Sequence, residues 1–178
     1  MASIETRRLA PTDFRLLGDL DRSERVTHAY RIDDGSLRRF EVDWDIPDWF
    51  PGEGPHHVGT HIADMAPAFD AGGILLGAFD GEDVAGLAIV VPGFEDRMAW
   101  LAFLHVSRPH RRGGVGALLW DEAAGLARAE GSTSMYVSAI PSGPAVDFYV
   151  GRGCRPVAEP HPALLAEEPD DLHLVCRL

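Results

Sequence analysis

Residues 101–116 read LAFLHVSRPHRRGGVG, an apolar run followed by a turn rich in arginine and glycine, and this stretch decides the fold. The apolar part belongs to a segment, 97–106, that is expected to form a strand. The segment that follows, 114–130, has apolar residues at helical spacing and is followed by Gly131, so it is predicted to be a helix. A strand therefore meets a helix through a turn with little side-chain bulk.

Such a turn is suited to holding phosphate groups. The first amides of a helix have no partner inside the helix and carry a partial positive charge. Glycines at 113, 114 and 116 let a phosphate approach the backbone, and Arg111 and Arg112 supply charged donors. The patterns of a P-loop and of a dinucleotide-binding fold are missing, and the chain has no lysine. The alternative is an ordinary turn whose glycines only allow tight packing.

Three segments in the right order resemble the GCN5-related N-acetyltransferase superfamily. The signature of that family, Gln/Arg-x-x-Gly-x-Gly/Ala, reads RRGGVG at 111–116, and 101–110 resembles the strand and the Val-x-Pro lead-in before it. Downstream, AVDFYVGRGC at 145–154 is similar to the Ala-x-x-Phe-Tyr-x-x-x-Gly-Phe of the family. The resemblance is good from about residue 84 to about residue 157 and weak before that.

The resemblance implies an α/β fold of the mixed type, with a central twisted, mostly antiparallel sheet whose fourth and fifth strands splay apart, flanked by helices. The chain has 178 residues, of which 46% are hydrophobic, so we expect one such domain over 1–178. The pattern predicts strands at 3–9, 74–79, 84–91, 97–106, 134–140, 154–158 and 171–177, helices at 11–20, 21–28, 57–70, 114–130 and 144–152, a hairpin at 30–45 and a loop at 47–55.

The resemblance also implies an activity, the transfer of an acetyl group from acetyl-CoA to a primary amine by direct attack in a ternary complex, without a metal. The residues it assigns to the co-substrate are the backbone of Leu104 and Val106 for pantetheine, the turn residues Arg111, Arg112, Gly113, Gly114, Val115, Gly116 and Ala117 for the pyrophosphate, and Ser142, where the family often has asparagine. The Val106 amide would also polarise the thioester carbonyl.

Proton transfer is less completely assigned by the resemblance. Tyr149 occupies the position of the family's general acid, and the alternative is that it packs with Phe148 against the sheet. No general base is assigned. Trp100 stands where some members have glutamate, and His105 on the same strand titrates near neutrality but could equally be structural.

The acceptor pocket has no recognisable motif. Trp44, Trp49 and Phe50, with Asp43, Asp45 and Asp48, could line a pocket for a cationic amine or form a small core under a loop. His56, His57 and His61 lack the spacing of a zinc site, so we expect them to face solvent or the acceptor cleft. The acceptor therefore stays open, a cationic small molecule being one candidate.

Composition narrows the class of protein further. A net charge of -12 argues against a nucleic-acid partner, and no apolar stretch suits a signal peptide or a membrane span. Cys154 and Cys176 lie far apart in sequence, which favours a reducing, cytoplasmic location without a disulfide. A homodimer is compatible with the resemblance. The rival function is a non-catalytic acyl-CoA sensor of the same fold, and a third option is an unrelated phosphate-binding α/β protein.

Overall fold

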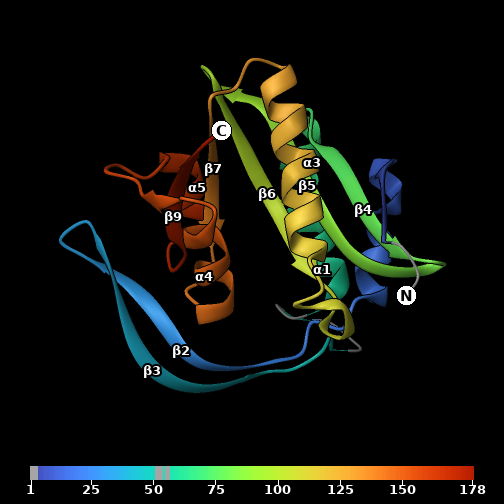
Figure 1. Cartoon of the computed structure of the whole chain (residues 1–178), viewed down its shortest axis with the longest axis horizontal. Coiled ribbons are helices and arrows are strands. Elements are labelled where there is room, and N and C mark those ends of the chain that lie inside the picture. Colours follow the sequence, from blue (N-terminus) through green and yellow to red (C-terminus); the bar gives the residue numbers. More distant parts are fainter. Residues whose placement is uncertain (1–3, 51–53, 55–56) are drawn as a thin grey trace.

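The computed structural model describes residues 4–50, 54 and 57–178, which are organised around a seven-stranded sheet (Figure 1). Its strands run in the order β1 (Glu5–Leu9), β4 (Ile74–Asp80), β5 (Asp83–Glu95), β6 (Met98–Val106), β7 (Ser134–Ala139), β9 (Leu172–Arg177) and β8 (Arg155–Pro156). All neighbouring strands are antiparallel except β6 and β7, which are parallel. The mostly antiparallel mixed sheet expected from the sequence is confirmed.

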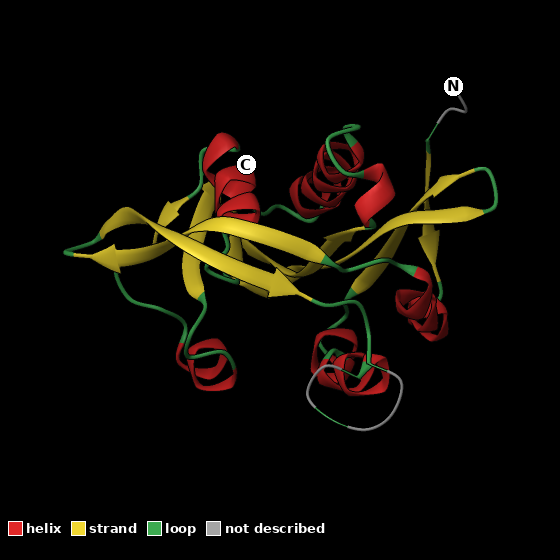
Figure 2. Cartoon of the chain, turned by 90° about the horizontal axis from the view of Figure 1, so that it is seen from below, coloured by secondary structure: helices red, strands yellow, loops and turns green. Residues whose placement is uncertain are grey.

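Helices cover both faces of this sheet, as Figure 2 shows from its edge. One face carries α3 (Val115–Ala129) and α4 (Gly143–Gly151), and the other carries η1 (Pro11–Asp19), α1 (Val58–Asp64), α2 (Ala66–Asp70) and α5 (Pro162–Glu167). Strand β5 contributes to both apolar cores, because successive side chains such as Ala88 and Ile89 point to opposite faces. Its unbroken apolar run at 84–91 follows from this burial on both sides.

Strands β6 and β7 separate after a short paired stretch. They are in register from Met98 with Ser134 to Leu101 with Val137. Beyond that point β6 continues to Val106 without a partner on this side, whereas β7 stays paired with β9 as far as Ala139. These are the strands that the family counts as fourth and fifth, and their splay is the feature expected from the resemblance.

A two-stranded arm lies outside the main sheet. Strands β2 (Glu24–Asp33) and β3 (Ser36–Ile46) form an antiparallel hairpin that passes close to α4 in Figure 1. It is attached by a hydrogen bond of 2.9 Å from the Tyr30 amide to the Pro141 carbonyl. The predicted hairpin is confirmed, but the predicted helix at 21–28 is wrong, because residues 24–28 belong to strand β2, in which Val26 pairs with Trp44 and His28 with Glu41 of β3.

Two other helix predictions need correction. The segment 57–70 is interrupted at Met65, since Pro67, in the first turn of α2, has no amide to continue a single helix. Helix α5 was not predicted.

The short 3-10 turn η2 (Arg108–His110) connects β6 to the turn before α3. Within the described residues no helix combines the length and apolar character needed to cross a membrane.

The expectation that the cysteines form no disulfide is wrong, because Cys154 and Cys176 are bonded to each other. Strand β8, which starts next to Cys154, pairs with β9, which contains Cys176. The pairing thus brings two residues 22 positions apart into contact in the core, where both are buried. Their separation in sequence gave no indication of this proximity.

Candidate active site

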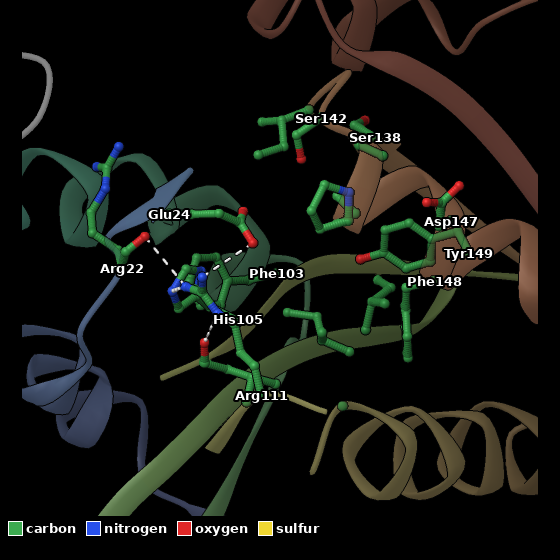
Figure 3. A pocket seen from close by; sticks show the side chains of 18 of the residues that line it. Arg22, Glu24, Phe103, His105, Arg111, Ser138, Ser142, Asp147, Phe148 and Tyr149 are labelled. Carbon is green, nitrogen blue, oxygen red and sulfur yellow. Dashed lines mark hydrogen bonds and ion pairs between the residues drawn. The ribbon is translucent and has the colours of Figure 1, made fainter. Parts of the chain in front are cut away.

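A cavity of about 940 Å³ lies where β6 and β7 separate (Figure 3). Its walls come from the second half of β6, the turn before α3, the end of β7 and the first turns of α4. Side chains from the opposite face of the sheet, including Trp49 and Met65, also line it. The cavity therefore extends from the helix α3 side of the splayed strands to the side covered by α1 and α2.

The edge of β6 that faces this cavity offers free backbone groups. The Ser107 amide donates to the Ala85 carbonyl of β5 at 2.9 Å. Because amides alternate in direction along a strand, those of Val106 and Leu104 point to the other side, toward the gap. The Val106 carbonyl accepts a hydrogen bond of 3.0 Å from Arg111 Nε, so it is the amide of Val106 that stays available.

The turn before α3 leaves room for an anion at its backbone. Gly114 is the N-cap of α3 and has a φ of 87°, and a Cβ built there would meet nothing within 4 Å. A Cβ on Gly116 would lie 3.4 Å from the Phe148 ring. Residues 112–114 are exposed, so the first amides of a 15-residue helix open onto solvent and the cavity. A diphosphate at this turn stays the prediction made from the sequence.

The Arg111 side chain was predicted to donate to a phosphate, but in the structure it binds other parts of the chain. Its guanidinium turns away from the α3 turn and donates to the carbonyls of Ser23 at 3.1 Å and Arg22 at 3.3 Å. It also forms an ion pair of 3.2 Å with Glu24. Arg111 thus joins the chain before β2 to the end of β6. Arg112 is exposed at the turn and lines the cavity.

Tyr149 is placed by α4 with its ring in the core and its hydroxyl in the cavity. The residue is 7% exposed, and its ring packs against Trp120 at 6.0 Å between centroids and against Phe148. Figure 3 shows the hydroxyl directed into the cavity, where it forms no hydrogen bond with any described residue. Burial, and secondarily the charge of Asp171, raises the pKa of Tyr149, so the phenol stays protonated.

Two serines present buried hydroxyls to the same cavity. Ser142 is the N-cap residue of α4 and 2% exposed, yet its side chain makes no capping bond. Its Oγ and that of Ser138 on β7 are buried without a hydrogen-bond partner in the described part of the chain. A buried hydroxyl without a partner costs free energy. Both positions would be satisfied by a polar ligand in the cavity (Figure 3).

The strand residues weighed as bases are not arranged for that role. His105 lies beside Arg111, with 3.5 Å between its Nε2 and Arg111 Nη2. Burial and the positive charges of Arg111 and Arg22 lower the pKa of His105 to about 4, so it is neutral and weakly basic near pH 7. Trp100 is buried and packs on Phe94 at 5.2 Å.

Of the aromatic residues expected at the acceptor pocket, Trp49 is the one that lines the cavity among those described. Its Nε1 donates to the Leu20 carbonyl at 2.9 Å. Trp44 and Phe50 are exposed elsewhere, and the predicted acids do not line the cavity: Asp43 pairs with Arg25, Asp48 accepts the amides of Arg22 and Trp49, and Asp45 lies on the exposed side of β3.

The predicted histidines divide between structural and lining positions. The His57 side chain caps α1 by accepting the Gly59 amide at 3.1 Å. His61 lines the cavity with its ring 5.2 Å from that of Trp49. His56 lies outside the described residues.

Five acidic or histidine residues of the cavity were missed by the sequence reasoning. Glu24 and His28 come from β2, Asp147 from α4, and Glu168 and Asp171 from the segment between α5 and β9. His28 Nε2 lies 2.9 Å from an Asp147 carboxylate oxygen, which joins the arm to α4. Asp147 stands inside the quoted motif at 145–154 and was the one detectable signal. The others are brought together only by tertiary pairing.

Comparison with known proteins agrees with this geometry. A model of the acetyltransferase (GNAT) family matches residues 39–153, so the chain belongs to this family. No curated protein sequence matches it. Its structure is similar to that of nourseothricin acetyltransferase, with a TM-score of 0.72 and 22% identity over 98% of each chain.

It is also similar to the PaiA N-acetyltransferase of Thermoplasma acidophilum in complex with coenzyme A, with a TM-score of 0.63 and 14% identity over 99% of each chain. The IAA acetyltransferase of Bacillus cereus ATCC 14579 gives a TM-score of 0.60 and 14% identity over 99% of this chain and 100% of that one. At these identities the likeness shows the fold. Family membership makes this chain an acetyl-CoA-dependent N-acetyltransferase.

Proposed function

We propose that this enzyme acetylates a primary amine of a cationic small molecule by direct attack on acetyl-CoA in a ternary complex. The observation that carries the proposal is the cavity between the splayed strands. It is lined both by the turn before α3 and by side chains such as Trp49 on the other face of the sheet. Two substrates can therefore approach one point from opposite sides, without a covalent acyl-enzyme.

The co-substrate would be held mainly by backbone groups. The free edge of β6 at Leu104 and Val106 suits the amides of pantetheine, and the amides from Arg112 to Ala117 suit the pyrophosphate. The unpartnered Oγ of Ser142 supports a polar contact at the position where the family often has asparagine. The Arg111 amide is outside this set, because it donates to the Arg108 carbonyl at 3.3 Å, and the Arg111 side chain stabilises the site from behind.

The reaction then needs little chemistry from the protein. The amine nitrogen bonds to the thioester carbonyl carbon, the carbon–sulfur bond breaks with its electron pair passing to sulfur, and the amine nitrogen loses a proton. The Val106 amide would donate to the oxyanion of the tetrahedral intermediate. Water that reaches the open cavity would take the amine proton, so we assign no residue as general base.

Tyr149 would supply the proton that the departing sulfur receives. Its raised pKa keeps the hydroxyl protonated at neutral pH. The same apolar surroundings also raise the pKa of a thiol, which is ordinarily about 8.5, so the thiolate formed here is a stronger proton acceptor than in water. Water then restores the phenol proton.

The test is an acceptor panel with acetyl-CoA, following release of free thiol, together with calorimetry of CoA binding. We expect CoA to bind and at least one amine to raise thiol release above hydrolysis. CoA binding without any amine-dependent release would favour the rival function, an acyl-CoA sensor. If calorimetry detected no heat with CoA or its acyl forms, both the acetyltransferase and the acyl-CoA sensor would be rejected.

Three broader predictions accompany the proposal. One domain over 1–178 is supported by a sheet that includes both β1 and β9. A cytoplasmic location and a homodimer stay predictions, to be checked by cell fractionation and by sedimentation. Fractionation would be combined with mass mapping of the Cys154–Cys176 pair, because a disulfide is unusual in a reducing compartment.

A further inference from the structure

Two carboxylates in the lining of the cavity have no hydrogen-bond or ion-pair partner among the residues that the structure describes. Glu168 follows α5 and Asp171 precedes β9, and we refer to them as the acid pair. A hydrogen bond of 3.2 Å from the Asp171 amide to the Glu168 carbonyl closes the turn between them. Leu172, the next residue, pairs with Ala139 at the end of β7, so the turn is fixed beside the gap between β6 and β7.

The acid pair differs from the other acids of the cavity. Glu24 is paired with Arg111 at 3.2 Å, and Asp147 is held by His28 at 2.9 Å. Neither carboxylate of the acid pair has a hydrogen bond or ion pair with any residue that the structure describes. The charged groups that act on the pair are themselves acids, Asp64 and Glu167 on Glu168 and Asp170 on Asp171.

This arrangement is unfavourable for the protein alone. Burial, with repulsion by neighbouring Asp170, raises the pKa of Asp171 to about 6, and burial shifts that of the more exposed Glu168 in the same direction. A carboxylate with a raised pKa gains free energy when a cation arrives beside it. The unfavourable charge therefore favours a cationic ligand.

Buried polar groups point to a ligand at the same place. The Tyr149 hydroxyl is in a residue 7% exposed, is directed into the cavity and has no partner among the described residues (Figure 3). The charge of Asp171 acts on this phenol, and both members of the acid pair line the same cavity as Tyr149. Ser142, 2% exposed, adds a second buried hydroxyl without a partner.

We infer that the acid pair binds an ammonium group of the acceptor other than the one that is acetylated, so that the preferred acceptor is a diamine or polyamine. This inference rests on the proposed function. A carboxylate pair stabilises the protonated form of an amine, whereas attack on the thioester requires the neutral form. The acid pair is therefore suited to the ammonium group that is not acetylated, and the reacting nitrogen would lie nearer Tyr149.

The test compares 1,n-diaminoalkanes of three to six carbons with the n-alkylamines of the same length. We expect kcat/KM to be about tenfold or more higher for the best diamine, and this preference to fall in high salt. Asp171→Asn, Glu168→Gln and the double variant should lose about tenfold on the diamine and little on the monoamine. Glu159→Gln is the control, since this acid is exposed, lies outside the cavity lining and is not among the charges that act on the pair.

Two outcomes overturn the inference. One is an equal loss on both amines, which would assign the pair to the chemical step, and the other is no loss on either. Calorimetry of 1,5-diaminopentane with the CoA-bound protein separates this inference from the proposed function. Binding that the double variant loses would uphold the subsite even if no amine were acetylated, and no binding to the wild type would reject it.

Discussion

Tyr149 has a packed ring and a hydroxyl without a partner, so the two can be separated by mutation. Tyr149→Phe keeps the ring contacts, and we expect thermal stability to change by less than about 0.5 kcal/mol. We expect kcat to fall about 10²-fold or more, since the departing sulfur loses its donor. CoA affinity by calorimetry should be unchanged. A variant with normal kcat would show that water supplies the proton.

Gly114 can be tested against a second glycine of the same helix. Gly114 and Gly131 stand at the two ends of α3, both with a φ of 87° and with open space where a Cβ would be. Alanine at either position should cost about 1 kcal/mol of stability from the left-handed backbone. Only Gly114→Ala should also weaken CoA binding, by about tenfold or more, because its Cβ would occupy the anion site.

Calorimetry and thermal melts of both variants make this comparison. If Gly131→Ala weakened CoA binding as much as Gly114→Ala, the effect would come from loss of helix stability rather than from the turn.

At the scale of elements, Arg111 attaches the start of the β2–β3 arm to β6. Arg111→Ala leaves Glu24 partly buried without its partner and removes donors to four main-chain carbonyls. We expect a loss of about 2–4 kcal/mol in the free energy of unfolding by urea. The control is Arg25→Ala on β2, next to Glu24. The ion pair of Arg25 with Asp43 is exposed, so its loss should lower the free energy of unfolding by less than about 1 kcal/mol.

Equal losses in the two variants would contradict the role given to Arg111. A larger increase in hydrogen exchange of the arm than of α3 in Arg111→Ala would locate the effect in β2 and β3.

Sequence alone sufficed for the elements whose burial is regular. The apolar run at 84–91, the helical spacing of α3 and the glycine turn before it each fix a local structure, and the two motifs gave the family. The first part of strand β2 was missed because its pairing with the end of β3 and the contacts of Arg111 with Ser23 join residues far apart in sequence. Local spacing carries no information about such contacts.

The candidate site was predictable only on its co-substrate side. Gly114 and Tyr149 lie in segments with recognisable patterns, whereas Glu168 and Asp171 become part of the cavity through the pairing of β7 with β9. The disulfide was missed for the same reason. Residues that recognise a variable acceptor are brought together by long-range contacts rather than by a motif.

At the scale of the whole molecule, the acid pair should lower stability at neutral pH. The pKa of Asp171 is raised to about 6 in the folded chain, so the folded state binds this proton more tightly than the unfolded state. Stability therefore falls as the pH rises from about 4 to about 6 and stays lower above that. Asp171→Asn should raise the free energy of unfolding at pH 7.5 by about 1–3 kcal/mol.

This gain should disappear below about pH 4, where the carboxyl is protonated in both states. Denaturation at pH 3.5 and pH 7.5 measures it, with Glu159→Gln as the exposed control expected to change stability by less than about 0.5 kcal/mol. A gain of equal size at both pH values would trace to contacts of the amide instead of to charge.

The last residues of β6 are not paired with β7 in the described part of the chain, so the main sheet has a free strand edge in its middle. A strand edge with unpaired backbone groups opens more easily than a paired one, and it can pair with an extended peptide from another molecule. Pantetheine would act as a temporary extra strand there, and the lifetime of the enzyme in a cell would then follow the metabolic supply of its thioester. When the cellular concentration of the acyl donor falls, more of the enzyme would be without ligand and open to proteolysis, so the amount of protein would fall together with its activity.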